Sequence, residues 1–116
     1  MTRLYKQEEK QIQKAILDYL AYNKIKAWRN NSGMIFGRDS NGKSYGHRMG
    51  PAGSCDIIGI LNDGRFLGIE VKRPGHFLTE LQKEFIDDIN SKKGVAFLAC
   101  SIDDVIAGLK NANVCL

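Results

Sequence analysis

The stretch GSCDIIGILNDGRFLGIEVK, residues 53–72, contains two apolar runs on either side of a turn sequence, which predicts a β-hairpin. Asp56 opens its first strand. Glu70 and Lys72 close the second strand and stand two residues apart, so they share one face of the sheet. Charges in these places are unexpected in a purely structural core, and the pattern favours a metal site on the hairpin.

The length of the turn decides whether the two acids meet. A two-residue loop at Asp63-Gly64 would direct Asp56 and Glu70 to opposite faces of the sheet. A three-residue loop over 62–64, with Gly64 left-handed at a bulge, would set Asp56 directly opposite Glu70. Opposed like charges destabilise a sheet unless a cation lies between them. A shared metal therefore requires the three-residue loop.

Upstream of the hairpin, residues 7–22 carry apolar side chains at spacings of three and four, which predicts an amphipathic helix. Glu9 lies on the same stripe as Ile16 and Leu20, whereas Glu8 falls at the other margin of the stripe. Either acid could face the site. The alternative is a solvated first-turn glutamate that the helix dipole favours.

Two short strands are expected at 25–31 and 34–37, followed by a glycine-rich basic ribbon over 37–48 with a hairpin-turn signal at Asn41-Gly42. Tyr45 lies between the cations of the ribbon and could stack on a base. This ribbon suits phosphates, although a solvated loop is the alternative. The candidate DNA-binding residues here are Arg29, Arg38, Lys43, His47 and Arg48.

After the hairpin, Pro74-Gly75 ends the strand, and Thr79 with Gln82 forms a capping-box pattern for the next helix. Residues 95–100 form a continuous apolar run typical of a strand buried on both faces, and a last helix follows. We therefore expect one α/β domain over residues 1–116, a mixed sheet flanked by helices in the order α-β-β-β-α-β-α. The final strand should lie parallel to its neighbour, because a helix makes the crossover.

The bulk composition is that of an ordinary globular protein. The 116 residues are 43% hydrophobic and 26% charged, with a net charge of +4 that permits a polyanionic partner. Three cysteines without Cys-x-x-Cys spacing indicate neither a disulfide framework nor a zinc site. No apolar run approaches the roughly 20 residues of a membrane span, so we expect no membrane partner and a cytoplasmic location.

The charged residues of the hairpin suggest a specific chemistry. Magnesium and manganese prefer oxygen ligands, which Asp56, Glu70 and the backbone carbonyl of Val71 could supply. Lys72 could position a water molecule near a phosphate and stabilise developing charge. Alternatively, Lys72 is a surface lysine paired with one of the acids. Together, these groups would suit the hydrolysis of a phosphodiester bond.

Three motifs together resemble the PD-(D/E)xK nuclease superfamily: Gly-x-x-Asp at 53–56, Glu-x-Lys at 70–72, and Gln82 on the following helix. Within it the chain is most similar to the VRR-NUC (virus-type replication-repair nuclease) domain. The resemblance runs from the helix bearing residues 9–13, through 28–31, to 101–104. One departure is Cys55 before Asp56, where the superfamily has proline.

The resemblance implies a restriction-endonuclease-like fold and a Mg²⁺- or Mn²⁺-dependent DNA endonuclease acting in DNA repair or recombination. It assigns metal binding to Asp56 and Glu70, the catalytic lysine to Lys72, and the helix acid to Glu9 in preference to Glu8. It also suggests that Gln82 holds the lysine or the attacking water, a position that capping alone would equally explain.

Further implications concern the partners. Small members of phage and bacterial origin are similar in build to Holliday-junction resolvases, which implies branched DNA as substrate, a homodimer and a bacterial host cell. Arg73 and His76 would contact phosphate beside the site, or be solvated loop residues. Two competing hypotheses are a catalytically silent DNA-binding accessory domain of the same fold and a small protein-interaction module.

Overall fold

The structure is a computed structural model that describes residues 2–31, 34–48 and 50–116, apart from the side chains of residues 2–7, 34 and 48. Its elements follow the chain as α1 (Thr2–Tyr22), β1 (Lys26–Arg29), β2 (Met34–Arg38), β3 (Ser44–Arg48), β4 (Ile57–Ile60), β5 (Phe66–Val71), α2 (Glu80–Ser91), β6 (Val95–Ala99) and α3 (Ile102–Asn111). The α/β class with a mixed sheet is confirmed. The predicted element order is wrong, because the described part of the chain has five strands between α1 and α2, two of them in the hairpin that the basic ribbon forms.

Four strands form the main sheet in the order β1-β4-β5-β6. The pairs β1–β4 and β4–β5 are antiparallel, whereas β5 and β6 are parallel. The parallel pair confirms the prediction that α2 makes a crossover between neighbouring strands.

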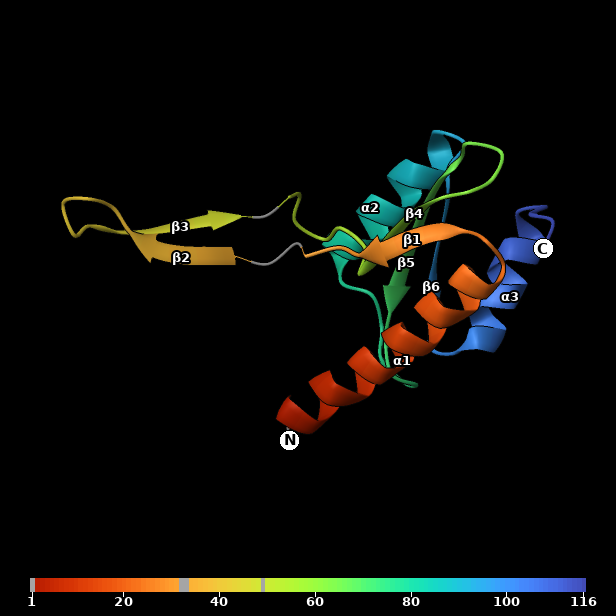
Figure 1. The fold of residues 1–116 in the computed structure, drawn as a ribbon, viewed down its shortest axis with the longest axis horizontal. Coiled ribbons are helices and arrows are strands. Elements are labelled where there is room, and N and C mark those ends of the chain that lie inside the picture. The colour runs from red at the N-terminus through yellow and green to blue at the C-terminus, as the bar shows by residue number, and fades with distance from the viewer. Residues whose placement is uncertain (1, 32–33, 49) are drawn as a thin grey trace.

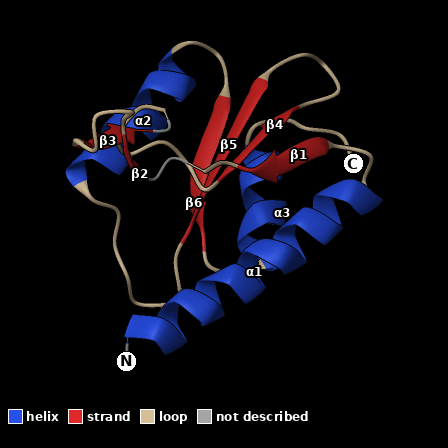
Figure 2. Ribbon diagram, turned by 60° about the vertical axis from the view of Figure 1, so that its left-hand side comes forward, coloured by secondary structure: helices blue, strands red, loops and turns tan. Residues whose placement is uncertain are grey.

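Helices cover both faces of this sheet, with α1 and α3 on one side and α2 on the other (Figure 2). The main core joins Ile16 and Leu20 of α1 to apolar side chains of β5 and α3. On β5, alternate residues such as Ile69 and Val71 point into this core, so the intervening Glu70 points toward α2. The carboxyl group of Glu70 therefore lies on the α2 side of the sheet.

The central hairpin has the register that a shared site requires. Ile57 pairs with Ile69, and Ile60 pairs with Phe66, so continuing the same register by one residue sets Asp56 opposite Glu70. The loop closes with a hydrogen bond from Leu61 N to Arg65 O at 2.9 Å. Gly64 has a φ of 93°, in the left-handed region that favours glycine. The predicted three-residue loop is confirmed.

Helix α1 begins at Thr2, earlier than predicted; Ile16 and Leu20 of its predicted apolar stripe are buried, whereas Ala15 is exposed. Asn23 donates from Nδ2 to Tyr19 O at 2.9 Å, and Lys24 follows with a φ of 60°, so the helix ends where the sequence indicates. Neither α1 nor any other helix in the described ranges is long and apolar enough to cross a membrane.

Strands β2 and β3 form a separate antiparallel hairpin that projects from the body along its long axis (Figure 1). The molecule measures 53 × 33 × 27 Å, and this hairpin accounts for much of the longest dimension. Its turn forms at Asn41-Gly42 as predicted, where Asp39 Oδ1 accepts hydrogen bonds from the backbone N–H groups of Asn41 and Lys43, each at 2.9 Å. The predicted basic ribbon is thus an ordered arm.

Candidate metal and catalytic site

Asp56 is held at the open end of the β4–β5 hairpin by two backbone contacts. Val71 donates its N–H to Asp56 Oδ2 at 2.9 Å, and Asn30 donates its N–H to the Asp56 carbonyl at 2.7 Å. The Asn30 side chain also donates from Nδ2 to Ser54 Oγ and to the Cys55 carbonyl, each at 3.0 Å. Asn30 is therefore a positioning residue for Asp56 that the sequence analysis missed, because it lay inside the strand predicted over 25–31, whereas β1 ends at Arg29.

Gly53 brings the segment before Asp56 against α2. Its φ is 79°, and a Cβ placed there would lie 2.5 Å from the backbone carbonyl atoms of Leu81. Only glycine meets both conditions, because other residues strain at positive φ and would collide with the helix backbone. The glycine of the Gly-x-x-Asp motif thus has a structural reason, which is to let the loop that carries Asp56 approach α2.

Glu70 is almost completely buried, with 2% of its surface exposed. Gln82 of α2 donates from Nε2 to Glu70 Oε1 at 2.9 Å, while its own Oε1 accepts from Thr79 N at 2.9 Å. The capping interpretation of Gln82 is therefore confirmed, and the group that its side-chain amide contacts is Glu70; a role in holding Lys72 or the attacking water stays a prediction. The other carboxyl oxygen, Oε2 of Glu70, is buried and accepts no hydrogen bond from any residue that the structure describes.

The two acids influence each other's charge. Burial, followed by the charge of Asp56, raises the pKa of Glu70 to about 9, and the charge of Lys72 opposes the rise. Without a cation, Glu70 thus keeps its proton at neutral pH while facing Asp56.

Lys72 follows β5 directly and is half-buried. Its ammonium group lies close enough to lower the pKa of Glu70, yet among the described residues it forms no ion pair with either acid. Its N–H donates to Ala99 O of the parallel neighbour at 3.2 Å, which extends the β5–β6 ladder. The alternative of a lysine merely paired with Asp56 or Glu70 is not supported.

Among the described residues, no third acid joins Asp56 and Glu70 in a metal-binding group. Helix α1 packs on the sheet face opposite to Glu70, Glu9 is half-buried and Glu8 is exposed. Within the described ranges, no group of three or more His, Cys, Asp or Glu side chains is arranged to hold a metal ion. A ligand role for Glu9 stays a prediction.

The candidate DNA-binding residues occupy different places. Arg29 ties β1 to α1, since its Nε donates to Gln13 Oε1 and its Nη2 to Lys10 O, each at 3.0 Å. Arg38, Lys43 and His47 are exposed on the projecting arm, and the side chain of Arg48 lies outside the described part. Near the acids, Arg73 is half-buried and His76 is exposed in the loop between β5 and α2.

Cys55 does not point away from the acids as strand alternation predicts. It lies before β4 begins, so alternation does not apply, and its side chain packs under α2 with Ile86 and Ala96. Burial, followed by the charges of Glu70 and Asp56, raises the pKa of the thiol to about 12. Cys55 is thus a buried, weakly acidic neighbour of the pair, which does not suit a nucleophile.

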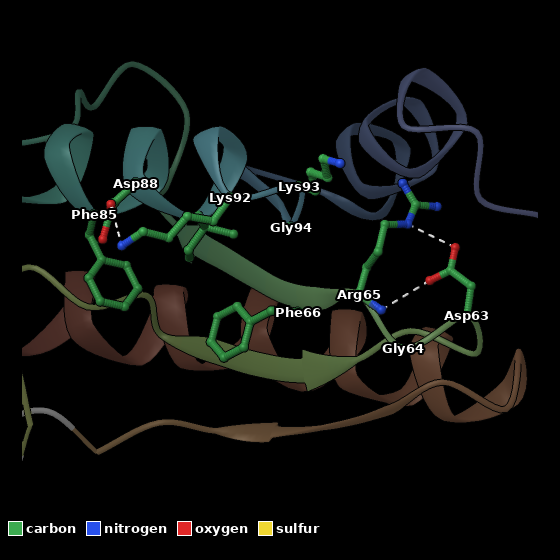
Figure 3. A pocket seen from close by; sticks show the side chains of 10 residues that line it. Asp63, Gly64, Arg65, Phe66, Phe85, Asp88, Lys92, Lys93 and Gly94 are labelled. Atoms are coloured by element: carbon green, nitrogen blue, oxygen red, sulfur yellow. Dashed lines mark hydrogen bonds and ion pairs between the residues drawn. The ribbon is translucent and has the colours of Figure 1, made fainter.

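A hollow of about 540 Å³ lies on the α2 side of the sheet, at the turn end of the central hairpin and away from the acids. Figure 3 shows Phe66 and Phe85 on its apolar side, with ion pairs between Arg65 and Asp63 and between Lys92 and Asp88 at its rim. Its cations are therefore largely neutralised. Asp56 and Glu70 lie at the opposite end of the hairpin.

Comparison of the chain with protein-family models, with curated proteins and with solved structures found no match. The geometry of the site is therefore the basis on which a function can be argued.

Proposed function

We propose that this chain is a Mg²⁺- or Mn²⁺-dependent endonuclease that hydrolyses phosphodiester bonds in branched DNA, including Holliday junctions. The observation that carries the proposal is the placement of Asp56 opposite the buried Glu70, with one Glu70 oxygen that receives no hydrogen bond from the described residues. A buried acid that faces a second carboxyl group is costly to a fold that gains nothing from the pair. A cation-binding role explains why this fold holds them together.

The donor set fits a hard divalent cation, which prefers oxygen ligands and retains water. Asp56, Glu70 and the backbone carbonyl of Val71 would hold it. When bound, the cation would supply charge neutralisation for the phosphate and a more acidic water molecule.

The remaining groups have positioning and electrostatic roles. The N–H of Val71 orients the Asp56 carboxylate, and Gln82 orients that of Glu70. Lys72 places a positive charge beside the acids without being neutralised by an ion pair to them. That ammonium group would contact a phosphate oxygen and stabilise the charge that develops on it.

The architecture supports a restriction-endonuclease-like fold as part of the proposal. A mixed sheet carries Glu-x-Lys at the end of one strand, and the neighbouring antiparallel strand is preceded by the aspartate. The parallel β5–α2–β6 unit places Gln82 above the glutamate. A mixed sheet with Asp56 and the Glu-x-Lys motif on neighbouring strands is compatible with the VRR-NUC resemblance, so we retain that family in the proposal.

A homodimer would supply the two sites that symmetric cleavage of a four-way junction needs. The sheet offers a suitable surface, because Trp28 on the edge strand β1, Ile60 on the adjacent strand β4 and Phe66 on the next strand β5 expose 44%, 47% and 42% of their surfaces. Exposed apolar rows next to an edge strand are typical of contact surfaces. Sedimentation of the purified chain would show the dimer.

The test is a cleavage assay on a labelled four-way junction, a flap and a duplex, with magnesium, manganese or EDTA. We expect cleavage with either metal and none in EDTA; cleavage that survives EDTA, or none with any metal, would contradict the proposal. Asp56→Ala, Glu70→Ala and Lys72→Ala should each abolish cutting while DNA affinity stays within about threefold, since phosphate contacts dominate binding.

The second candidate is a DNA-binding accessory domain without turnover. The lack of a three-acid cluster among the described residues favours it. It predicts salt-sensitive DNA binding with no cleavage in any metal, so the same assay separates the two functions.

A further inference from the structure

The β2–β3 arm exposes an aromatic ring that the proposed active site does not use. Phe36 has 76% of its surface exposed, although it lies in the middle of a paired strand. Its partner across the hairpin is Gly46, which has no side chain to pack against the ring. Because no cross-strand side chain covers it, the exposed ring of Phe36 offers an apolar surface to a binding partner.

Tyr45 is differently placed. A Cβ added to its partner Gly37 would lie 2.6 Å from Tyr45 Oη and 2.8 Å from Cζ, so the tyrosine ring lies across that glycine. The ring of Tyr45 thus already packs against Gly37 within the arm. The aromatic residue that the sequence suggested for stacking is therefore the less available one, and Phe36 is the free ring.

The charges on the arm indicate what the occupant is. Arg38 stands two residues from Phe36 on the same face, and Lys43 lies at the turn; neither is held by an ion pair or side-chain hydrogen bond among the described residues. The acid of the arm, Asp39, is engaged by two backbone N–H groups of the turn. The surface around the ring is thus cationic, which complements a polyanion.

We propose that the β2–β3 arm inserts into branched DNA, with Phe36 as a wedge that stacks on a base exposed at the branch point. The inference rests on the proposed function, whose substrate preference it explains. A two-stranded ribbon fits a DNA groove, and apolar side chains inserted at base steps are a known way to exploit local unstacking. A branch point already presents unstacked bases, so the wedge gains stacking there without the cost of opening a duplex.

The test measures binding of the full chain in EDTA, where no cleavage is expected, to an immobile four-way junction and to a duplex of matched sequence. Phe36→Ala should weaken junction binding about tenfold and duplex binding less than about twofold, because stacking on an aromatic ring is lost only where a base is available. Phe36→Trp should retain junction binding. The matched control is Tyr22→Ala, since Tyr22 at the end of α1 is 85% exposed and should have no effect.

A second readout reports insertion itself. With 2-aminopurine at the branch point, the parent chain should change the fluorescence of the base and Phe36→Ala should not. Unchanged junction affinity in Phe36→Ala, or equal loss on junction and duplex, would overturn the wedge.

The same binding, fluorescence and cleavage experiments show whether the wedge proposal or the nuclease proposal is wrong. If the parent chain cuts the junction in magnesium but Phe36→Ala behaves like it in both binding readouts, the wedge is wrong and the nuclease stands. If the parent chain gives the junction-specific fluorescence change but cuts in no metal, the wedge stands and the nuclease is wrong. Absence of DNA binding by the parent chain contradicts both.

Discussion

Gln82 donates a hydrogen bond from Nε2 to Oε1 of Glu70 at 2.9 Å, and the same side chain closes the capping box of α2 through Thr79. One residue therefore couples the start of a helix to the carboxyl group of the adjacent strand. The contact leaves Glu70 Oε2 as the oxygen without a donor from the described residues. The helix start, the buried acid and the candidate metal site form one unit, and the predictions below test its parts.

Replacing Gln82 should lower the free energy of unfolding more than replacing the N-cap residue Thr79. Thr79→Ala loses the hydroxyl that accepts from Gln82 N and should lower the free energy of unfolding by about 1 kcal/mol. Gln82→Ala removes the hydrogen bond from Thr79 N and also leaves Oε1 of Glu70 without its donor. We therefore expect the free energy of unfolding to fall by about 2–3 kcal/mol. Urea unfolding of both variants measures the difference. Equal decreases for the two variants would show that the contact between Gln82 and Glu70 does not contribute to the free energy of unfolding.

The raised pKa of Glu70 predicts how stability depends on pH. In the unfolded chain Glu70 titrates at its ordinary value of 4.5, whereas in the folded metal-free protein its pKa is about 9. Between these values the folded state binds more protons than the unfolded state, so the free energy of unfolding falls as pH rises. Below about 4.5 both states are protonated, and the stabilising contribution is complete.

Glu70→Gln isolates this effect because the amide stays neutral at every pH. In EDTA, the free energy of unfolding of the parent chain relative to Glu70→Gln should decrease steadily from pH 5 to pH 8. The measurement is urea unfolding of both proteins across this range of pH. A difference that does not vary with pH would mean that Glu70 is ionised in the folded protein.

The two turn glycines provide a matched pair for the approach of the Asp56 loop to α2. Both have positive φ, 79° at Gly53 and 93° at Gly64, but a Cβ at Gly64 meets nothing within 4 Å. Gly64→Ala should therefore cost about 1–2 kcal/mol of stability from backbone strain alone. Gly53→Ala adds a collision with the backbone of Leu81, for a total of about 2–5 kcal/mol. Thermal unfolding would rank the two variants, and the reverse order would contradict the close approach.

Cations on the arm should contribute to DNA affinity through phosphate contacts. Arg38→Ala and Lys43→Ala should each weaken binding to junction and duplex alike and reduce the slope of log affinity against log salt by about 1. Lys14→Ala is the control, since Lys14 on α1 already pairs with Asp18 at 2.9 Å. Fluorescence anisotropy at several salt concentrations gives the slopes. Unchanged slopes for both arm variants would remove the arm from the DNA-binding surface.

Local chemistry explains which features were readable from the sequence. The capping box of α2 was predicted from Thr79 and Gln82 alone, whereas the sequence left two loop lengths open at 62–64 and only the requirement that the acids meet favoured the three-residue loop. Such features depend on residues a few positions apart.

The missed features depend on contacts between distant segments. Asn30 reaches Ser54 and Cys55 across the sheet. Cys55 escapes strand alternation because it precedes β4. Likewise, only the register of β2 and β3 shows that Tyr45 covers a glycine while Phe36 stands opposite one. The predicted element order was wrong because residues of the basic ribbon form β3, which pairs with β2 in a hairpin separate from the main sheet.

The most direct test of the central claim is a Mn²⁺ titration of the purified chain, followed by electron paramagnetic resonance, with the parent protein, Asp56→Asn and Glu70→Gln compared at the same pH. We predict saturable binding by the parent chain that both variants lose, since each removes one of the two carboxylate ligands while preserving its shape. Equal Mn²⁺ binding by all three proteins, or no saturable binding by the parent chain, would contradict a metal site between Asp56 and Glu70.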